Sequence, residues 1–271
     1  MTRGSDRTIE IGGAVIHVAD RGAGPAIVFG HSLGFDGEMW AAQVEELSPS
    51  HRTLAIDFRG HGKSTSTGPF TLDDLADDVA RILDRLEIER AAYCGLSLGG
   101  MVGMRFALRH PSRAAALVLA NTSCEPEEPA RRQMFETYNE HARGREPDAQ
   151  GTALMMSLMF SRELVAARPE VERVFRDKLF RPDRDDQRYH AARAVLARPD
   201  LCAELASLAI PTLVIGSTGD VAVPFVHARV LAAAIPRATL CELPGGHTSA
   251  VEHAPEFTAA IRKHLEKVTY R

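Results

Sequence analysis

Residues 91–108 read AAYCGLSLGGMVGMRFAL, and a buried strand, a tight turn and a helix follow one another within this segment. The first four residues form an apolar run, as in a strand that is covered on both faces. Gly95-Leu96-Ser97-Leu98-Gly99 then forms a GxSxG pattern directly before a helical stretch that ends ahead of Pro111. A nucleophilic serine at a strained strand-to-helix turn needs small neighbours, because other backbone passes close to it. The pattern therefore predicts that Ser97 is a nucleophile at the carboxyl edge of a sheet.

Candidate strands and helices alternate on both sides of this segment. Runs that indicate strands lie at 8–11, 14–18, 25–29, 53–56, 91–94, 115–120, 212–215 and 238–243. The first two flank Gly12-Gly13, which is typical of a hairpin turn, and most of the others are separated by apolar residues at helical spacing. Strands separated by helices form parallel sheets that are covered on both faces. We therefore expect an α/β fold with a mostly parallel, eight-stranded sheet and helices on both faces.

The alternation stops between residues 125 and 205. Glu125-Pro126-Glu127-Glu128-Pro129 has the composition of a linker, and apolar residues at helical spacing follow at 134–138, 153–160, 171–179 and 189–196. A helical block that interrupts a sheet in this way is a candidate for a cap, or lid. We expect a core made of residues 1–124 and 206–271 and a helical cap made of residues 125–205.

A serine nucleophile needs a base, because its hydroxyl is a weak nucleophile near neutral pH. Of the 11 histidines, His247 follows Gly245-Gly246 and the last predicted strand, so its loop lies at the same edge as Ser97. Asp220 follows the strand at 212–215 and is a candidate for the carboxylate that orients the imidazole. The order Ser97, Asp220, His247 is the one expected for this type of turn. The alternatives are a structural loop histidine and an aspartate that caps the next helix.

The loop after the strand at 25–29 reads GHSLG, residues 30–34. It predicts that the backbone N–H of Leu33 stabilises an oxyanion together with the N–H of Leu98, which begins the helix after Ser97. We expect His31 to bond to loop backbone rather than to move protons. In the polar segment 57–64, Arg59 is predicted to form a structural ion pair.

The composition excludes several classes of function. The 271 residues include 45% hydrophobic and 25% charged residues, and the formal net charge is −4. This balance offers no basic surface for nucleic acid or anionic lipid, and no apolar stretch approaches the ~20 residues that span a membrane. Motifs for a metal or an organic cofactor are absent from the sequence. We expect no nucleic acid, membrane, metal or cofactor as a partner.

The cysteines and the first residues indicate a reducing location. Four cysteines are too few for a disulfide scaffold, and they show no metal-binding or redox spacing. Cys94 and Cys241 lie in apolar runs, which predicts buried free thiols. Residues 1–6 contain no apolar signal core. These observations together predict a cytoplasmic protein.

Taken together, these segments resemble the α/β-hydrolase superfamily over nearly the whole chain, and most of all its 3-oxoadipate enol-lactonase group. The likeness is carried by residues 31–40, 94–101, 119–122 and 211–220, and by His247 with Glu252 and Pro255 behind it. The resemblance implies an α/β-hydrolase fold with a helical cap. It also implies a cofactor-free serine hydrolase that acts on a small-molecule ester or lactone through Ser97, Asp220 and His247.

The expected cap departs from the pattern of that group. An Arg-Trp-Phe triplet often lies near the substrate there, whereas the comparable residues of this chain are Leu158-Met159-Phe160. The change removes a cation and predicts an apolar pocket whose lining includes Trp40, Met155, Met159 and Phe160. The alternative is that the methionines belong to the core of the cap, as methionines at helical spacing often do.

Other reactions stay open at such a site. The same three residues support carbon–carbon bond hydrolysis, acyl transfer and perhydrolysis, and a ligand receptor can keep the fold without turnover. The sequence also leaves open the exact substrate, the conformation of the cap and whether the protein forms a homo-oligomer.

Overall fold

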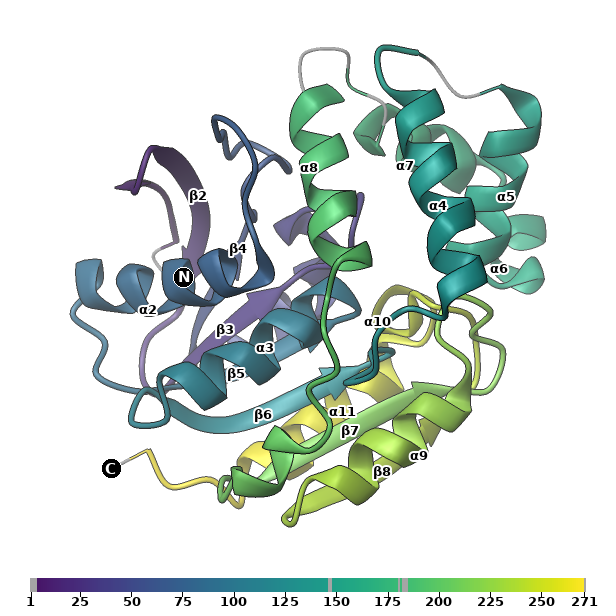
Figure 1. The fold of residues 1–271 in the computed structure, drawn as a ribbon. Helices are drawn as coiled ribbons and strands as arrows, with labels where there is room; N and C mark the ends of the chain where they lie inside the picture. The colour runs from purple at the N-terminus through teal and green to yellow at the C-terminus, as the bar shows by residue number, and fades with distance from the viewer. Residues whose placement is uncertain (1–3, 146–147, 180, 182–184, 271) are drawn as a thin grey trace.

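A single twisted sheet organises the core (Figure 1). The computed structural model describes residues 4–145, 148–179, 181 and 185–270. Within these residues eight strands pair in the order β1-β2-β4-β3-β5-β6-β7-β8. They are β1 (Ser5–Ile11), β2 (Ala14–Arg21), β3 (Ala26–Gly30), β4 (Arg52–Ile56), β5 (Ala91–Leu96), β6 (Ala114–Ala120), β7 (Thr212–Ser217) and β8 (Ala238–Leu243). Only β2 runs against its neighbours, so the prediction of a mostly parallel sheet is confirmed.

Helices cover both faces of the sheet because its parallel strands are apolar on both sides. In β3, Val28 packs on one face while Ile27 and Phe29 pack on the other. The first face is covered by α2 (Leu72–Arg85), α3 (Leu98–Arg109) and α9 (Phe225–Ala234). The second face is covered by the short 3-10 helix η1 (Gly37–Trp40), α1 (Ala41–Leu47) and α11 (Ala254–Leu265). The predicted layers are therefore confirmed.

The described residues between β6 and β7 form five α-helices and no strand. These helices, called here the helical segment, are α4 (Pro129–Ala142), α5 (Ala149–Met159), α6 (Arg162–Ala167), α7 (Glu170–Leu179) and α8 (Asp185–Leu196). Figure 1 shows them gathered as a group on one side of the core. The short 3-10 helix η3 (Glu204–Ser207) then leads back to the sheet. Helix α6 has no counterpart among the helices expected from the sequence.

A disulfide joins the stretch of chain that leads into the helical segment to the stretch that leads out of it. Cys124, four residues after β6, is bonded to Cys202, 78 residues further along the chain. Cys94 and Cys241 are free, and burial raises the pKa of both thiols. The sequence missed the pairing because only the fold brings positions so far apart together. The predicted reducing location rested partly on the cysteines, and this bond removes that support.

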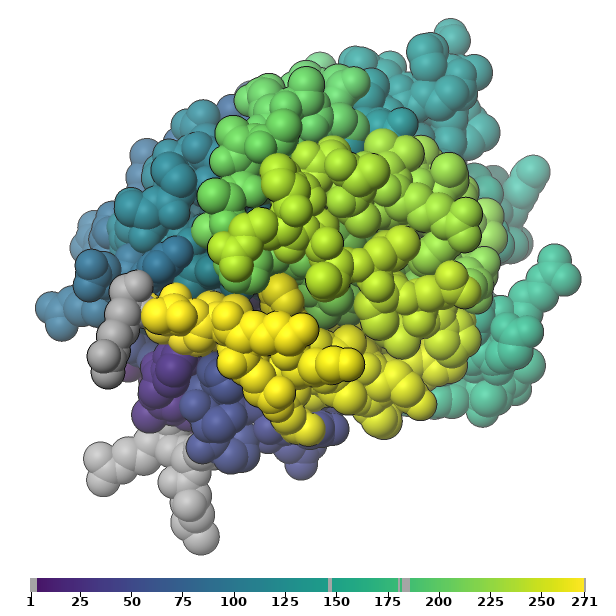
Figure 2. Space-filling view, turned by 90° about the horizontal axis from the view of Figure 1, so that it is seen from below, coloured from purple at the N-terminus to yellow at the C-terminus, as the bar shows by residue number. Residues whose placement is uncertain are grey.

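The C-terminal residues pack against the early part of the chain. In the view from below, yellow residues lie directly against blue ones (Figure 2). The rings of His51 and Tyr270 are 6.4 Å apart, and the phenol of Tyr270 is largely buried, which raises its pKa to about 12. No helix among the described residues has the length and apolar character needed to cross a membrane.

We predict that the disulfide stabilises the folded protein. Replacing both Cys124 and Cys202 by alanine should lower the free energy of unfolding by about 2–4 kcal/mol, because the bond closes a long loop in the unfolded chain. Urea unfolding with and without dithiothreitol measures the effect. The wild type and a Cys241→Ala control should lose stability in the reductant, and the double variant should not respond. Alkylation of Cys124 and Cys202 in the protein before any reductant is added would contradict the prediction.

Candidate active site

Ser97 occupies a strained turn between β5 and α3. Its backbone angles are φ 54° and ψ −112°, and such a conformation costs a non-glycine residue about 1–3 kcal/mol. A side chain at Gly95 would overlap the backbone of Gly99, and a side chain at Gly99 would overlap the backbone of Gly30. Only glycines at both positions allow β5, α3 and β3 to approach so closely. The turn holds Ser97 at the carboxyl end of β5.

Asp220 and His247 form a buried hydrogen-bonded pair at the same edge of the sheet. His247 Nδ1 lies 2.9 Å from Asp220 Oδ2, and the side chains are 1% and 0% exposed. A carboxylate at Nδ1 holds the imidazole in the tautomer whose Nε2 can accept a proton. Asp220 follows β7 and His247 follows β8, as the sequence predicts, and Gly219 N–H donates to Gly245 O at 3.0 Å between the two loops.

Asn121 completes the environment of this carboxylate. Its Nδ2 donates to Asp220 Oδ2 at 2.8 Å, and the N–H of Val223 donates to Asp220 Oδ1 at 2.8 Å. The Oδ1 atom of Asn121 accepts a hydrogen bond from the hydroxyl of Ser249, two residues after His247. Sequence reasoning did not assign Asn121 this role, although its position directly after β6, between the strands that lead to Ser97 and Asp220, could have suggested it.

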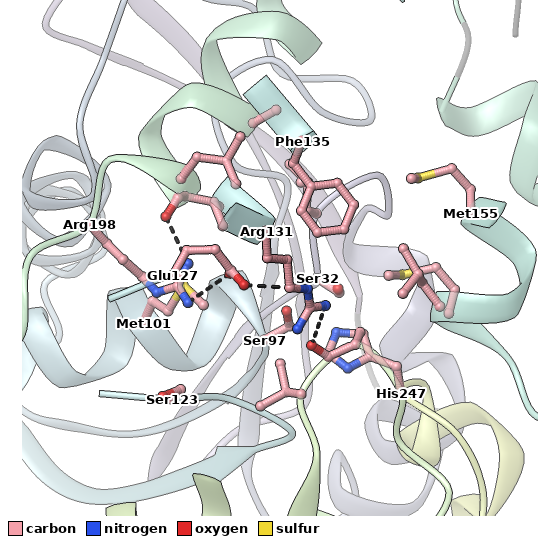
Figure 3. A pocket seen from close by; sticks show the side chains of 18 of the residues that line it. Ser32, Ser97, Met101, Ser123, Glu127, Arg131, Phe135, Met155, Arg198 and His247 are labelled. Atoms are coloured by element: carbon pink, nitrogen blue, oxygen red, sulfur yellow. Dashed lines mark hydrogen bonds and ion pairs between the residues drawn. The ribbon is translucent and has the colours of Figure 1, made fainter. Parts of the chain in front are cut away.

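Ser97 and His247 line the same cavity (Figure 3). The structure contains no hydrogen bond between the Ser97 hydroxyl and the imidazole. In ligand-free enzymes such contacts are often long and tighten only when substrate binds. The geometry thus brings together all three residues that the sequence singled out, with the imidazole of His247 already oriented by Asp220.

His31 fixes the loop that carries the second expected oxyanion donor. His31 Nδ1 donates to Ser32 O at 2.8 Å, and the N–H of Phe58 donates to His31 Nε2 at 2.9 Å. The prediction that His31 bonds to loop backbone is confirmed. Because a trans peptide points its C=O and N–H in opposite directions, the bond to Ser32 O also fixes the direction of the Leu33 N–H. Among the described residues, the N–H groups of Leu33 and Leu98 find no acceptor.

Two side chains of the neighbouring segment 57–64, which donates to His31 through the N–H of Phe58, are also buried. Arg59 forms a bidentate pair with Asp78, with N–O distances of 2.6 and 2.8 Å, so its prediction as an ion-pair residue is confirmed. His61 packs on His31 with 4.7 Å between ring centroids. Burial lowers the pKa of His31 to about 4 and that of His61 to about 3. Both rings are therefore neutral near pH 7.

Comparisons with known proteins agree with this geometry. A sequence profile described as "alpha/beta hydrolase fold" matches residues 25–254. The chain belongs to the α/β-hydrolase family. The 3-oxoadipate enol-lactonase 2 of Acinetobacter baylyi is 30% identical over 92% of this chain and 90% of its own length. A relative from Caulobacter sp. (strain K31), named provisionally as the carbamate hydrolase RutD, is 33% identical over 88% of this chain and 90% of its own.

Solved structures show the same family likeness. The enol-lactonase from Burkholderia xenovorans LB400 superposes with a TM-score of 0.86 at 32% identity, and the match covers 96% of this chain and 100% of that one. The resemblance to the 3-oxoadipate enol-lactonase group that the sequence indicates is therefore confirmed.

The active-site cavity of this α/β hydrolase has a volume of about 350 Å³ and lies between the core and the helical segment. Leu33, Ser97 and His247 line it from the core, and Met155 and Met159 line it from α5. The loop that carries His247 is tied to this helix, because Thr248 donates to Met159 O through both its N–H and its hydroxyl. Movement of α5 would therefore displace the loop that carries His247.

Two residues predicted to line the pocket lie elsewhere. Trp40 is fully buried in the core, where its ring packs against Phe29 and Phe257 at 5.1 and 5.9 Å between centroids. Phe160 packs its edge against the ring of Phe175, which does line the cavity. Both predictions are wrong, because a large apolar ring near an active-site loop gains more by filling the core than by facing a cavity.

One wall of the cavity carries charged residues that the sequence did not predict. Arg198 NH2 lies 3.0 Å from Glu127 Oε2, and Arg131 pairs with the same glutamate at 3.4 Å (Figure 3). Arg131 also donates to the carbonyl of Ala222, two residues after Asp220, at 2.7 Å. The sequence missed this wall because it is built from residues at both ends of the helical segment and from the loop that follows Asp220. No cluster of three or more metal-ligating side chains gathers among the described residues.

We predict that stability falls on mild acidification. The unfolded histidines titrate near pH 6.5, whereas burial lowers the pKa of folded His31 to about 4 and of His61 to about 3. Stability is therefore complete above pH 6.5 and decreases as the pH falls toward 4, because the unfolded chain binds more protons. Each histidine contributes up to about 1.4 kcal/mol per pH unit.

Urea unfolding at pH 7, 6 and 5 tests this prediction. His61→Gln should flatten the pH dependence of the unfolding free energy, and substitution of the exposed His141 by glutamine should leave it as in the wild type. An unchanged slope in His61→Gln would show that its ring is not held neutral.

Proposed function

We propose that the protein is a serine hydrolase that cleaves a small carboxylic ester or lactone through an acyl-enzyme on Ser97. The observation that carries the proposal is the buried Asp220–His247 pair beside a serine held in a strained turn. The enol-lactonase relatives support the choice of an ester or lactone. Residues 125–205 would then act as the cap over the site.

In the first half of the reaction, Ser97 Oγ attacks the carbonyl carbon of the substrate while His247 Nε2 takes the hydroxyl proton. Asp220 stabilises the imidazolium through the hydrogen bond at Nδ1. The charge on the carbonyl oxygen is held by the N–H groups of Leu33 and Leu98, which have no acceptor of their own among the described residues. The tetrahedral intermediate then expels the alcohol, which takes the proton from His247 and leaves the acyl-enzyme.

In the second half, a water molecule attacks the acyl carbon, and His247 accepts one proton from that water. The second tetrahedral intermediate is stabilised by the same two N–H groups. Its collapse returns the proton to Ser97 Oγ and releases the acid. For a lactone, the released alcohol and acid belong to the same molecule, so a single product leaves the cavity.

The cavity supports a small substrate that is partly apolar. A volume of about 350 Å³ lies at the lower end of the range for small-molecule pockets. Met155 and Met159 offer flexible apolar contacts on one side, while the charged wall of Glu127, Arg131 and Arg198 provides polar contacts on the other. An apolar portion of the substrate would lie along α5.

Carbamate hydrolysis is a second candidate, because the relative from Caulobacter carries that provisional name at 33% identity. A carbamate carbonyl can be attacked by the same serine and held by the same donors. A panel of matched lactones, esters and carbamates distinguishes the two, and the proposal expects a higher kcat/KM for the ester or lactone.

We predict that Ser97→Ala lowers kcat for p-nitrophenyl acetate by at least about 1,000-fold while the fold stays intact. A fluorophosphonate probe should label the wild type and a Ser157→Ala control, whose serine is exposed on α5, but should not label Ser97→Ala. Circular dichroism checks the fold. Undiminished turnover by pure Ser97→Ala would contradict the proposal.

A further inference from the structure

The hydroxyl of Ser32 is buried against the active-site cavity and has no partner. Ser32 is 1% exposed and lines the cavity together with Ser97 and His247. No described residue accepts from or donates to its Oγ. A buried hydroxyl without a hydrogen bond destabilises the folded state, so in native proteins such a group calls for an explanation.

The rest of Ser32 is held firmly in place. Its carbonyl accepts the 2.8 Å bond from His31, and its N–H lies 3.4 Å from the sulfur of Met39. The loop is also joined to the turn at Ser97, because Gly99 N–H donates to His31 O at 3.0 Å. The unpaired hydroxyl therefore belongs to a rigid part of the site rather than to a loose surface loop.

Its position relates it to the expected oxyanion donors. Ser32 and Leu33 share the peptide group whose N–H is proposed to hold the oxyanion, and Figure 3 shows Ser32 at the same end of the cavity as Ser97. A third serine, Ser123, also lines the cavity, but its hydroxyl is hydrogen-bonded to Glu125. The unpaired hydroxyl of Ser32 thus lies at the end of the cavity where negative charge is expected to develop during acyl transfer.

We propose that the Ser32 hydroxyl is a third oxyanion donor, which gives its O–H to the substrate carbonyl oxygen beside the N–H groups of Leu33 and Leu98. This inference rests on the proposed acyl transfer at Ser97. The hydrogen bond strengthens as the carbonyl oxygen becomes an anion, so it favours the transition state over the bound substrate. The Ser32 hydroxyl has no partner in the protein alone because, in this proposal, its partner is the substrate carbonyl oxygen.

Ser32→Ala tests the inference with p-nitrophenyl acetate. We expect kcat to fall about 10- to 100-fold with KM within about twofold, because a donor that acts mainly in the transition state is lost. The melting temperature should stay the same or rise, since the variant removes a buried hydroxyl that has no partner. The inhibition constant of a trifluoromethyl ketone, which binds as an oxyanion, should rise by the same factor as kcat falls.

A matched control is Ser66→Ala. Ser66 is also buried, and its hydroxyl also lacks a partner among the described residues, but it does not line the cavity. We expect this variant to keep the kcat of the wild type. Ser32→Cys keeps nearly the same volume with a weak donor and should also lose kcat, which guards against a folding defect in Ser32→Ala.

Two results would overturn the inference. One is a Ser32→Ala or Ser32→Cys variant that folds and keeps both the kcat and the KM of the wild type. The other is a variant that keeps this kcat and raises KM, which would make Ser32 a ground-state contact. Absence of ester, lactone and carbamate hydrolysis by the wild type would instead refute the proposed function itself, so the two failures are distinguishable.

Discussion

The close approach of backbone around Ser97 is the constraint on which the active site depends. Gly99 lies against the backbone of Gly30, and Gly95 lies against Gly99, so the turn leaves no room for a side chain at either motif glycine. The strain at Ser97 is sustained because β5 packs in the core through both of its faces and α3 packs against one of them. The same approach lets Gly99 donate to His31 O, which joins the turn at Ser97 to the 30–34 loop. The two parts of the site therefore form one rigid unit.

Most polar groups of the site are already paired within the protein. Asp220 accepts from His247, Asn121 and Val223, and both ring nitrogens of His31 are engaged. Among the described groups that lack a partner are the N–H groups of Leu33 and Leu98 and the hydroxyl of Ser32. A site organised in this way needs little rearrangement when charge develops on a substrate, because its donors are fixed beforehand.

The parts that could be predicted from sequence are those determined by local pattern. Ser97 has its glycines beside it, Asp220 and His247 each follow a recognisable strand, and parallel strands bring their carboxyl ends to one edge. What the sequence could not give depends on contacts across the chain. The Cys124–Cys202 bond spans 78 residues. The burial of the Trp40 ring depends on its contact with Phe257, which lies far along the chain.

The charged wall and the role of Asn121 belong to the same category. Arg131 meets the loop of Asp220 only because α4 begins beside that loop, and no periodic pattern marks such a meeting. The sequence shows that Asn121 directly follows the strand β6, but it does not show that Asn121 bonds to Asp220. Side chains that orient a catalytic group are defined by three-dimensional neighbours, whereas the strand-to-helix turn has its own sequence signature.

In the proposed reaction, Ser97 carries the acyl group during turnover. Rapid mixing of the wild type with a p-nitrophenyl ester, followed by acid quenching and peptide mass spectrometry, tests it directly. The account predicts a peptide containing Ser97 that is heavier by the mass of the acyl group at times shorter than one turnover. Acylation of a different residue, or turnover with no covalent adduct at any quench time, would contradict it.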